Sequence, residues 1–344
     1  MIPDADSVVK FLLYCISAAV LGWSTTGIVR RLATGGRLVA EPSERGLHRR
    51  IVPVGGGLGF IGSAATIWVL WAGVPGNEWQ LAIVCALIGL IAVSVIDDVR
   101  SLPPMVRLTA QVAAVAAALW YVPADLRIVP WLPPQFERLL VGFLWVWLVN
   151  AVNFMDGSDG FAAVEGISVA SGYAIVASRL GAPEVVFPGL EVFALLLASA
   201  LAGFLIWNWA PARIFMGDTG SIPLGFIIGL FALDLALRGA WQAALILPLY
   251  FVVDATLTLL RRMARRERFW EAHREHAYQR AILAGATHSE VAIRLAVLNA
   301  ALIGLAVVSL VHPLWALIGA AGVTLLLFGS LSIRGARATS AKAR

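Results

Sequence analysis

Long apolar segments recur along the whole chain and are separated by short polar stretches. Eleven such segments run over residues 8–29, 55–74, 80–96, 105–121, 138–153, 163–179, 190–207, 222–237, 241–260, 295–311 and 313–333. Segments of about 17–25 apolar residues are long enough to cross a bilayer, where a helix satisfies its own backbone groups. The pattern therefore predicts an all-α, polytopic integral membrane protein with about eleven transmembrane helices.

Composition supports this class. The chain has 344 residues, of which 60% are hydrophobic and only 14% charged, and its mean hydropathy is +0.83. Residues 1–333 are expected to form a single transmembrane catalytic domain. Residues 334–344 are polar and basic, which predicts a disordered tail.

The basic residues predict the orientation. If the loops after odd-numbered segments share one side with the C-terminal tail, that side holds 21 of the 26 basic residues. The positive-inside rule then places the N-terminus outside and the C-terminus in the cytoplasm. The net charge of +5 is explained by topology and by affinity for membrane lipid, so nucleic acid is not expected as a partner. The cytoplasmic loops would be residues 30–54, 97–107, 150–163, 208–221 and 261–294.

The third of these loops is densely polar. Asn150 and Asn153 are spaced to share one face of a helix, and Asp156 and Asp159 follow them. Gly157 lets the backbone approach a ligand closely. A capped helix end needs one such side chain rather than four, so the cluster indicates a functional site.

Two further loops carry carboxylates. Asp97 and Asp98 end the third apolar segment, where the helix dipole disfavours acids. Asp218 precedes the eighth segment, where a simple helix cap is the alternative. Carboxylates from three loops on one membrane face suit Mg²⁺, or Mn²⁺, held by one or two carboxylates and by substrate phosphates.

Basic groups accompany these acids. Arg45 and His48 precede three glycines in the first loop, which suits a phosphate or a lipid head group. The fifth loop carries His273, Arg274, His276 and Arg280. The two histidines could bind zinc, but no cysteine or third nearby histidine supports this, and phosphate recognition is favoured. Asp254, inside the ninth segment, is either functional or simply paired with Arg261.

These groups together predict a Mg²⁺-dependent enzyme that joins a soluble phosphorylated donor to a lipid acceptor. Phosphoryl transfer needs mainly positioning and charge neutralisation from a protein. A lipid or glycan transporter is the alternative from another class, although charges in the middle of the segments are nearly absent. A CDP-alcohol phosphotransferase is a second alternative, but its Asp-Gly-x-x-Ala-Arg pattern is missing.

Five motifs, in order, resemble the polyprenyl-phosphate N-acetylhexosamine-1-phosphate transferase family. They are Pro42 to Gly57, Asp97-Asp98-x-x-x-Leu102, Asn150-x-x-Asn153-x-x-Asp156-Gly157-x-x-Gly160, Phe215-Met-Gly-Asp218-x-Gly-Ser221 and His273-x-x-His276. The resemblance implies that undecaprenyl phosphate attacks the β-phosphorus of a UDP-N-acetyl sugar, giving undecaprenyl-diphospho-sugar and UMP. It also implies the cytoplasmic face of a bacterial inner membrane, and a homodimer is plausible by the same analogy.

The resemblance extends to single residues. Asp218 would ligate Mg²⁺, with Asn153 as a second contact. Asp97 would deprotonate the lipid phosphate, and Asp98 would orient metal or lipid. Phe215 would stack on uracil, with Asp159 hydrogen-bonded near it. The remaining candidates are Asp156 and His273 as catalytic residues, and Arg45, His48, Asn150, Gly157, Arg213, Arg274, His276 and Arg280 as substrate-binding residues.

The fifth loop departs from one branch of the family. It has His-x-x-His in place of the histidine triplet associated with phospho-N-acetylmuramoyl-pentapeptide transfer. This favours the branch that primes O-antigen or other surface polysaccharides, with a UDP-linked GlcNAc, FucNAc or QuiNAc as donor. The pentapeptide transferase of peptidoglycan synthesis stays open as the alternative.

Overall fold

The computed structural model describes residues 5–34, 39–40, 47, 51–73, 76–123, 125–181, 185–186, 188–268 and 273–342. Its helices are α1 (Ala5–Thr34), α2 (Gly56–Ala72), α3 (Glu78–Arg100), α4 (Pro104–Trp120), α5 (Pro134–Phe154), α6 (Phe161–Leu180), α7 (Leu190–Asn208), α8 (Asp218–Leu237), α9 (Trp241–Ile246), α10 (Leu249–Ala264), α11 (Ala277–Leu283), α12 (His288–Val308) and α13 (Pro313–Lys342). Two short strands, β1 (Val39–Ala40) and β2 (Val52–Pro53), pair antiparallel, with Val39 opposite Pro53 and Ala40 opposite Val52.

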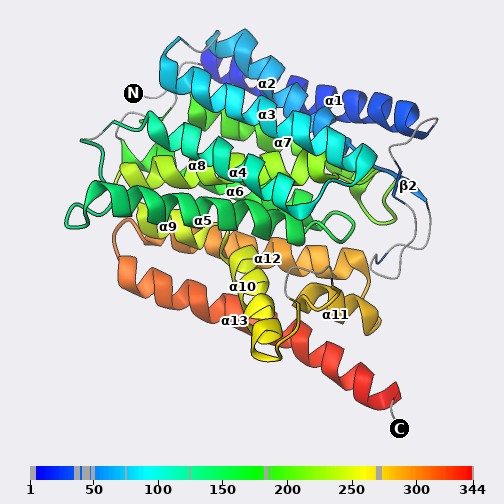
Figure 1. Ribbon diagram of the computed structural model, residues 1–344. Helices are drawn as coiled ribbons and strands as arrows, with labels where there is room; N and C mark the ends of the chain where they lie inside the picture. Colours follow the sequence, from blue (N-terminus) through cyan, green and yellow to red (C-terminus); the bar gives the residue numbers. More distant parts are fainter. Residues whose placement is uncertain are drawn as a thin grey trace.

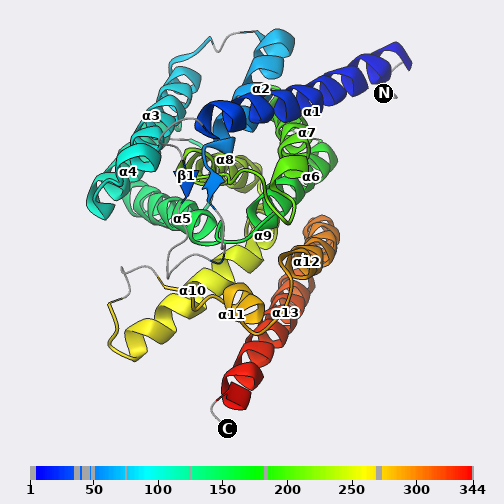
Figure 2. The same ribbon diagram turned by 90° about the vertical axis from the view of Figure 1, so that its right-hand side faces the viewer.

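Helix α8 forms the centre of the molecule. It packs against α2, α3, α5, α6 and α9, and Figure 2 shows it surrounded by other helices. Every residue from Thr219 to Phe231 is buried, as expected for a helix that is apolar all round. Gly225 lets α5 approach closely, since a Cβ there would lie 2.7 Å from the Cα of Val149.

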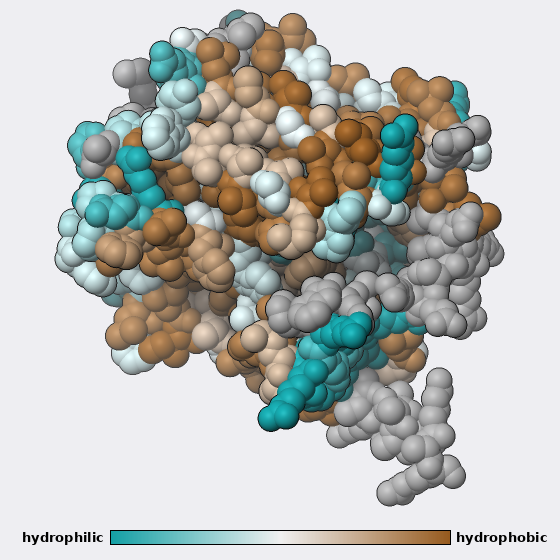
Figure 3. Space-filling view, in the orientation of Figure 1, coloured by the Kyte–Doolittle hydropathy of each residue, from teal (hydrophilic) through white to brown (hydrophobic). Residues whose placement is uncertain are grey.

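Many of the helices, central and outer, carry the features of a membrane protein. Among the described residues, eight helices are long and apolar enough to span a membrane: α1, α3, α5, α6, α7, α8, α12 and α13. Helices α2 and α4 are shorter but also apolar. Large apolar side chains such as Leu32, Leu70 and Leu326 are exposed, and hydrophobic residues cover much of the face in Figure 3. The all-α, polytopic membrane class is thereby confirmed, whereas the count of eleven spans and the orientation stay predictions.

The segment 241–260 is not one helix, contrary to the prediction. It divides into α9 and α10 at Leu247–Pro248, because proline lacks the N–H and crowds the preceding turn. Helix α10 then runs across the direction of most other helices (Figure 1). At the C-terminus, α13 continues to Lys342, where the sequence predicted a disordered tail from residue 334.

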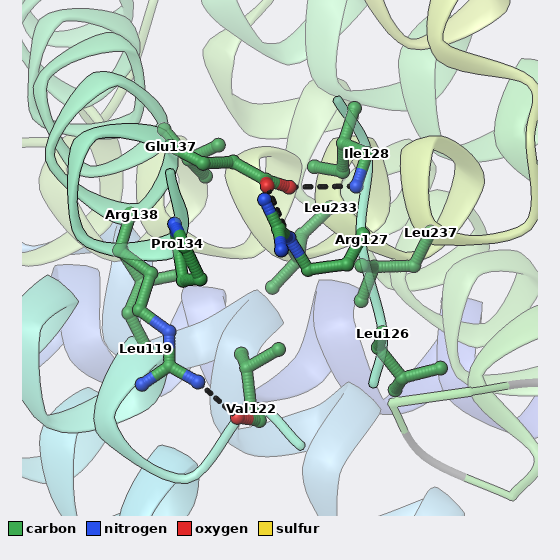
Figure 4. Close-up of a pocket in the computed structure, with 11 residues that line it drawn as sticks. Leu119, Val122, Leu126, Arg127, Ile128, Pro134, Glu137, Arg138, Leu233 and Leu237 are labelled. Atoms are coloured by element: carbon green, nitrogen blue, oxygen red, sulfur yellow. Dashed lines mark hydrogen bonds and ion pairs between the residues drawn. The ribbon is translucent and has the colours of Figure 1, made fainter. Parts of the chain in front are cut away.

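A buried acid, Glu137, organises the end of the molecule at which α4 and α8 finish and α5 begins. Glu137 accepts hydrogen bonds from Arg127 Nε at 2.6 Å and from the backbone N–H of Ile128 at 2.6 Å, and Arg138 donates to the carbonyl of Val122 at 2.7 Å (Figure 4). The cavity between these groups is small, about 30 Å³. These contacts join the loop before α5 to the helix ends, and we assign them a structural role.

Candidate active site

The first and fourth predicted loops meet along their backbones. Phe215 donates its N–H to the carbonyl of Pro53 at 2.8 Å, and its carbonyl accepts from the N–H of Gly56 at 3.0 Å. The next pair is Gly57 N–H to the carbonyl of Met216, at 3.1 Å. Strand β2 and the start of α2 are therefore fixed against the segment that leads into α8. Phe215 is half-buried beside this junction.

Asp98 caps the start of α8 from the end of α3. Its two carboxylate oxygens accept from the backbone N–H groups of Asp218 at 3.0 Å and Thr219 at 3.1 Å. An anion at a helix N-terminus satisfies otherwise unpaired N–H groups and complements the helix dipole. Gly217, at φ 71°, leaves room for this contact, since a Cβ there would lie 2.7 Å from Asp98 Oδ2. Asp98 thus positions Asp218.

Arg107 joins the second loop to the fourth. One guanidinium nitrogen lies 3.1 Å from Asp97 Oδ2 and 3.0 Å from Asp218 Oδ2. The other oxygen of Asp97 accepts from the N–H of Leu102. The guanidinium remains about one-third exposed, while Asp97 is 8% exposed. Arg107 is therefore a cation that two carboxylates hold at the edge of the cluster.

Asn153 and Asp156 complete this cluster from the third loop. The amide nitrogen of Asn153 donates to Asp218 Oδ1 at 2.8 Å and to Ser221 Oγ at 2.9 Å. Asp156 is half-buried and has no side-chain hydrogen bond within the described part of the chain. Burial, with the carboxylates of Asp218 and Asp98 nearby, raises the pKa of the Asp156 carboxyl well above its usual range. Within the described residues, the four acids of the cluster, Asp97, Asp98, Asp156 and Asp218, thus outnumber its one arginine, Arg107.

Asp159 connects three loops rather than opening into solvent. Its Oδ2 accepts from the N–H of Ala212 at 2.9 Å, and its Oδ1 lies 3.6 Å from His288 Nδ1. The same ring nitrogen lies 2.9 Å from Ser158 Oγ. Nearby, Asn208 accepts from the N–H of Gly160 at 3.0 Å. In this structure Asp159 fixes the turn between α5 and α6, and its contact with uracil stays a prediction.

Asn150 also has a protein partner. Its amide nitrogen donates to Gln111 Oε1 at 2.7 Å, and Gln111 is buried in α4. The pair fixes α4 to α5 one turn before Asn153. Asn150 therefore helps to set the position of Asn153, and a direct role in substrate binding stays a prediction.

Asp254 anchors the fifth loop, and its partners among the described residues do not include Arg261, the partner that the sequence suggested. The fully buried carboxylate accepts from Tyr250 Oη at 3.1 Å, from Thr258 Oγ1 at 3.1 Å and from the N–H of Ala277 at 3.0 Å. His276 Nδ1 lies 3.4 Å from it. The carboxylate caps α11 from α10, so His276 points toward this buried group.

His273 lies beside other polar residues of the fifth loop. The backbone N–H of Glu275 donates to its Nδ1 at 3.3 Å, and its ring centroid is 4.9 Å from that of His276. Burial, with His276 and Arg262 nearby, lowers the pKa of His273 to about 4. His273 is thus neutral at physiological pH, and phosphate binding by its charged form is not expected. Arg274, next to it, is partly buried.

Gly157 lies against the fifth loop, and the contact requires glycine. A Cβ at this position would lie 2.4 Å from Tyr278 Oη and 3.1 Å from Gln279 Nε2. Tyr278 donates to the carbonyl of Phe154 at 3.3 Å. Arg280, further along α11, donates to the carbonyl of Ser332 in α13 at 3.3 Å. The third loop and α11 therefore pack directly, while Arg280 contacts α13.

The structure brings together Asp97, Asp98, Asn153, Asp156 and Asp218, which the sequence predicted from three separate loops. Arg213 is directed elsewhere, over the ring of Trp207. Arg45 and His48 lie outside the described residues.

Arg107, Gln111 and His288 are contacts of the site that sequence reasoning missed. Arg107 and Gln111 could have been noticed in the sequence, because they are a charged residue and an amide within the otherwise apolar segment 105–121. His288 stood in the fifth loop without an assigned partner.

The cluster fits a hard divalent cation. Its donors are carboxylates and an amide oxygen, the ligands that Mg²⁺ prefers. The Asn153 amide oxygen and the Asp156 carboxylate are not used by other side chains that the structure describes. Within the same described ranges, no three His, Cys, Asp or Glu side chains are grouped to hold a metal ion. Such a site would need oxygen ligands from substrate phosphates, as is usual for Mg²⁺.

An apolar cavity of about 300 Å³ begins beside the cluster. It runs from Thr219, at the first turn of α8, to Leu230 of the same helix, a distance of about 16 Å at the usual rise per residue. Its other walls are α2 and α3, which contribute Gly62 and Ile88 among others, and the start of α7. Ile88 is 59% exposed, so the cavity borders the lipid-facing surface.

The chain is similar to known proteins over most of its length. The model of glycosyl transferase family 4 matches residues 80–236. A probable undecaprenyl-phosphate N-acetylglucosaminyl 1-phosphate transferase of Bacillus subtilis is 31% identical over 308 residues, covering 86% of this chain and 82% of the relative. A phospho-N-acetylmuramoyl-pentapeptide-transferase of Moorella thermoacetica is 33% identical over 247 residues, covering 66% of this chain and 75% of the relative.

A decaprenyl-phosphate N-acetylglucosaminephosphotransferase of Mycolicibacterium smegmatis is 30% identical over 314 residues, covering 81% of this chain and 77% of the relative. Similarity of this extent reaches well beyond the carboxylate cluster and includes most of the transmembrane helices. The chain belongs to glycosyl transferase family 4, the polyprenyl-phosphate N-acetylhexosamine-1-phosphate transferases.

Proposed function

We propose that this enzyme transfers an N-acetylhexosamine 1-phosphate from a UDP-sugar to undecaprenyl phosphate, giving undecaprenyl-diphospho-sugar and UMP. A phosphate oxygen of the acceptor forms a bond to the donor's β-phosphorus. The bond from that phosphorus to the bridging oxygen breaks, and UMP leaves with this oxygen. The observation that carries the proposal is the carboxylate cluster around Asp218, built from three loops in a chain of this family.

Within this reaction we assign metal binding to Asp218, with the amide oxygen of Asn153 and the carboxylate of Asp156 beside it. Mg²⁺, or Mn²⁺, would neutralise charge on the donor's diphosphate when bound. Asp98 keeps Asp218 in place by capping α8. The four acids around one arginine support a cation at this point, because a bound cation would favour the ionised form of Asp156.

Arg107 is the residue best placed to contact a substrate phosphate. Its guanidinium already lies between Asp97 and Asp218 and is partly exposed. Arginine can donate to two phosphate oxygens while it remains paired with a carboxylate, because it has five N–H groups. We propose that Asp97 orients Arg107, and action of Asp97 as the base toward the lipid phosphate stays a separate prediction.

The cavity beside α8 supports a lipid as one of the two substrates. Thr219 lines the cavity and also donates its N–H to Asp98. An apolar chain between α2, α3 and α8 would therefore end next to the cluster. We propose that the isoprenoid chain of the acceptor uses this cavity and that the reaction occurs at the cytoplasmic face of a bacterial inner membrane.

For the donor, we propose UDP-GlcNAc or a UDP-linked 6-deoxy-N-acetylhexosamine such as FucNAc or QuiNAc. The product would prime O-antigen or another cell-envelope polysaccharide. The Bacillus subtilis and Mycolicibacterium smegmatis relatives are named for N-acetylglucosamine, which favours GlcNAc among these donors. A second candidate is phospho-N-acetylmuramoyl-pentapeptide transfer, because the Moorella thermoacetica relative bears that name.

A donor panel tests both candidates in one assay. Purified protein is mixed with undecaprenyl phosphate, Mg²⁺ and one donor at a time, and UMP release is measured. We expect release with a UDP-N-acetylhexosamine, no release without the acceptor, and loss of release with a chelator. Release with UDP-MurNAc-pentapeptide alone would replace the first candidate by the second. No release from any donor would refute the proposed reaction.

A further inference from the structure

Two arginines from different elements lie against a single tryptophan at one end of α1 and α7. The guanidinium carbon of Arg30 is 4.9 Å from the ring centroid of Trp207, and that of Arg213 is 5.8 Å from the same centroid. The two charges are therefore within about 11 Å of each other, close to the screening length of physiological salt. Like charges gathered in this way favour an anion near both.

The packing around Trp207 is specific. Trp23, Gly27 and Arg30 follow the i, i+4, i+7 spacing, so they share one face of α1. Trp207 lies on this face, where a Cβ at Gly27 would lie 3.2 Å from its ring. Its indole N–H donates to the carbonyl of Trp23 at 2.9 Å, and the two rings stack with centroids 6.0 Å apart.

Arg213 is brought to the same ring by its backbone. Its N–H donates to the carbonyl of Trp207 at 2.8 Å, which turns the chain after α7 back toward α1. Within the described part of the chain, neither Arg213 nor Arg30 forms an ion pair with a carboxylate. The Nε of Arg30 is buried without a hydrogen-bond partner. The pair thus has donors and positive charge to offer to an anion.

This site borders the lipid-facing surface. Trp23 is 44% exposed, and Ile28 and Leu32 nearby on α1 are 55% and 73% exposed. Tryptophan and arginine are typical of the membrane–water interface, where the ring lies among head groups and the charge meets lipid phosphate. An anion bound here would therefore come with apolar chains that can lie along α1.

We propose that Arg30, Trp207 and Arg213 form a binding site for the phosphodiester head group of an anionic bilayer phospholipid. The site shares no residue with the carboxylate cluster, and the proposal does not depend on the proposed reaction. Arg31 provides the comparison, because it is the next residue of α1 but is exposed, and the arginines found over the Trp207 ring in the described part of the chain are Arg30 and Arg213. If the arginines only set the membrane orientation or complemented the helix dipole, a charge at position 30 and a charge at position 31 would have the same effect on lipid binding.

The test uses the full chain purified in detergent and titrated with phosphatidylglycerol or phosphatidylcholine, with bound lipid counted by native mass spectrometry. Arg30→Gln and Arg213→Gln should each weaken phosphatidylglycerol binding about fivefold. Arg31→Gln, which removes the same charge, should stay within about twofold of the wild type. Unchanged phosphatidylcholine binding shows that each variant is folded.

Two outcomes would overturn the proposal. If Arg31→Gln weakens phosphatidylglycerol binding as much as Arg30→Gln, the effect is general charge and not a site. If Arg30→Gln and Arg213→Gln bind phosphatidylglycerol like the wild type but raise the KM for a polyprenyl phosphate acceptor, the arginines belong to the substrate site. The binding readout is independent of turnover, so failure of the proposed reaction would leave this test intact.

Discussion

At the scale of single residues, several carboxylates in this protein accept hydrogen bonds from backbone N–H groups and so fix the local backbone. Asp98 accepts from two N–H groups at the start of α8, and Asp254 accepts from the first N–H of α11. Glu137 and Asp234 bind N–H groups of loops at the other end of the molecule. A charged acceptor satisfies several donors at once, which matters where water is scarce. An acid in an apolar segment therefore need not be catalytic.

Arg107 leads to the first prediction. Arg107→Gln removes the cation between Asp97 and Asp218, and we expect UMP release to fall about 100-fold, as for the loss of one donor that stabilises developing charge. Arg100→Gln is the matched control, since Arg100 is an exposed arginine at the end of α3. A rate for Arg107→Gln within about threefold of the wild type would exclude a role in phosphate binding.

His273 leads to a prediction on pH. Its pKa is about 4 in the folded protein, below the usual value near 6.5. As pH falls from about 6.5 to 4, the unfolded chain gains a proton at this position and the folded protein does not, so stability is lost in this window. Stability from this group is fully present at higher pH.

We therefore expect His273→Gln to flatten the fall of the thermal unfolding midpoint between about pH 6.5 and 4. His312→Gln, at an exposed histidine between α12 and α13, should leave the curve unchanged. Midpoints are measured in detergent across this pH range. Identical curves for His273→Gln and the wild type would contradict the assigned protonation state.

Residue patterns predicted part of the site. Asp97, Asp98 and Asp218 were expected to meet because an acid beside an apolar membrane helix is costly unless a cation or a proton partner compensates its charge. Arg107 was not expected, because a basic residue near a helix end is explained by topology alone. Tyr250 and Thr258 lie four residues on either side of Asp254, a helical spacing that the sequence contains. The contact with the N–H of Ala277 is tertiary and leaves no spacing in the sequence.

At the scale of elements, the start of α8 is the critical point. The helix carries Asp218, and Asp98 of α3 supplies its cap. Asp98→Ala should lower the free energy of unfolding by about 1–3 kcal/mol, because two N–H groups lose a charged acceptor. Asp98→Asn keeps one oxygen and should fall between Asp98→Ala and the wild type.

Thermal or denaturant unfolding in detergent checks this order. Asp125→Ala, at an exposed carboxylate before α5, serves as the control. The cap assignment fails if Asp98→Ala unfolds at the same midpoint as the control.

The break between α9 and α10 shows a limit of hydrophobic patterning. The segment 241–260 is apolar throughout, so length alone suggested one span. Pro248 was the available signal, since proline at that point interrupts the helix. The direction of α10 after the break depends on contacts with α5 and α13, which the pattern does not contain.

At the scale of the whole molecule, the apolar segments predicted most helices but not their neighbours. Apolar residues that face lipid and those that face protein look alike in the sequence. The absence of a polar face indicated that α8 is buried, but its neighbouring helices and the cavity along it were not predictable.

The cavity beside α8 leads to a prediction about the length of the isoprenoid chain of the acceptor. A Cβ at Gly62, in the cavity wall, or at Gly304, in α12, would meet open space. Gly62→Trp should fill the cavity and raise the KM for undecaprenyl phosphate about tenfold, with little effect on a short-chain acceptor. Gly304→Trp should change neither KM. Equal KM values for Gly62→Trp and Gly304→Trp would rule out this path for the acceptor chain.

The transferred group is the central claim, and the position of a radioactive phosphate tests it most directly. UDP-GlcNAc labelled at the β-phosphorus is incubated with the purified protein, undecaprenyl phosphate and Mg²⁺, and the lipid is extracted. We predict that the label enters the lipid fraction, that unlabelled UMP is released in equal amount, and that Asp218→Asn abolishes both. Sugar in the lipid with the label left on UDP would contradict the account.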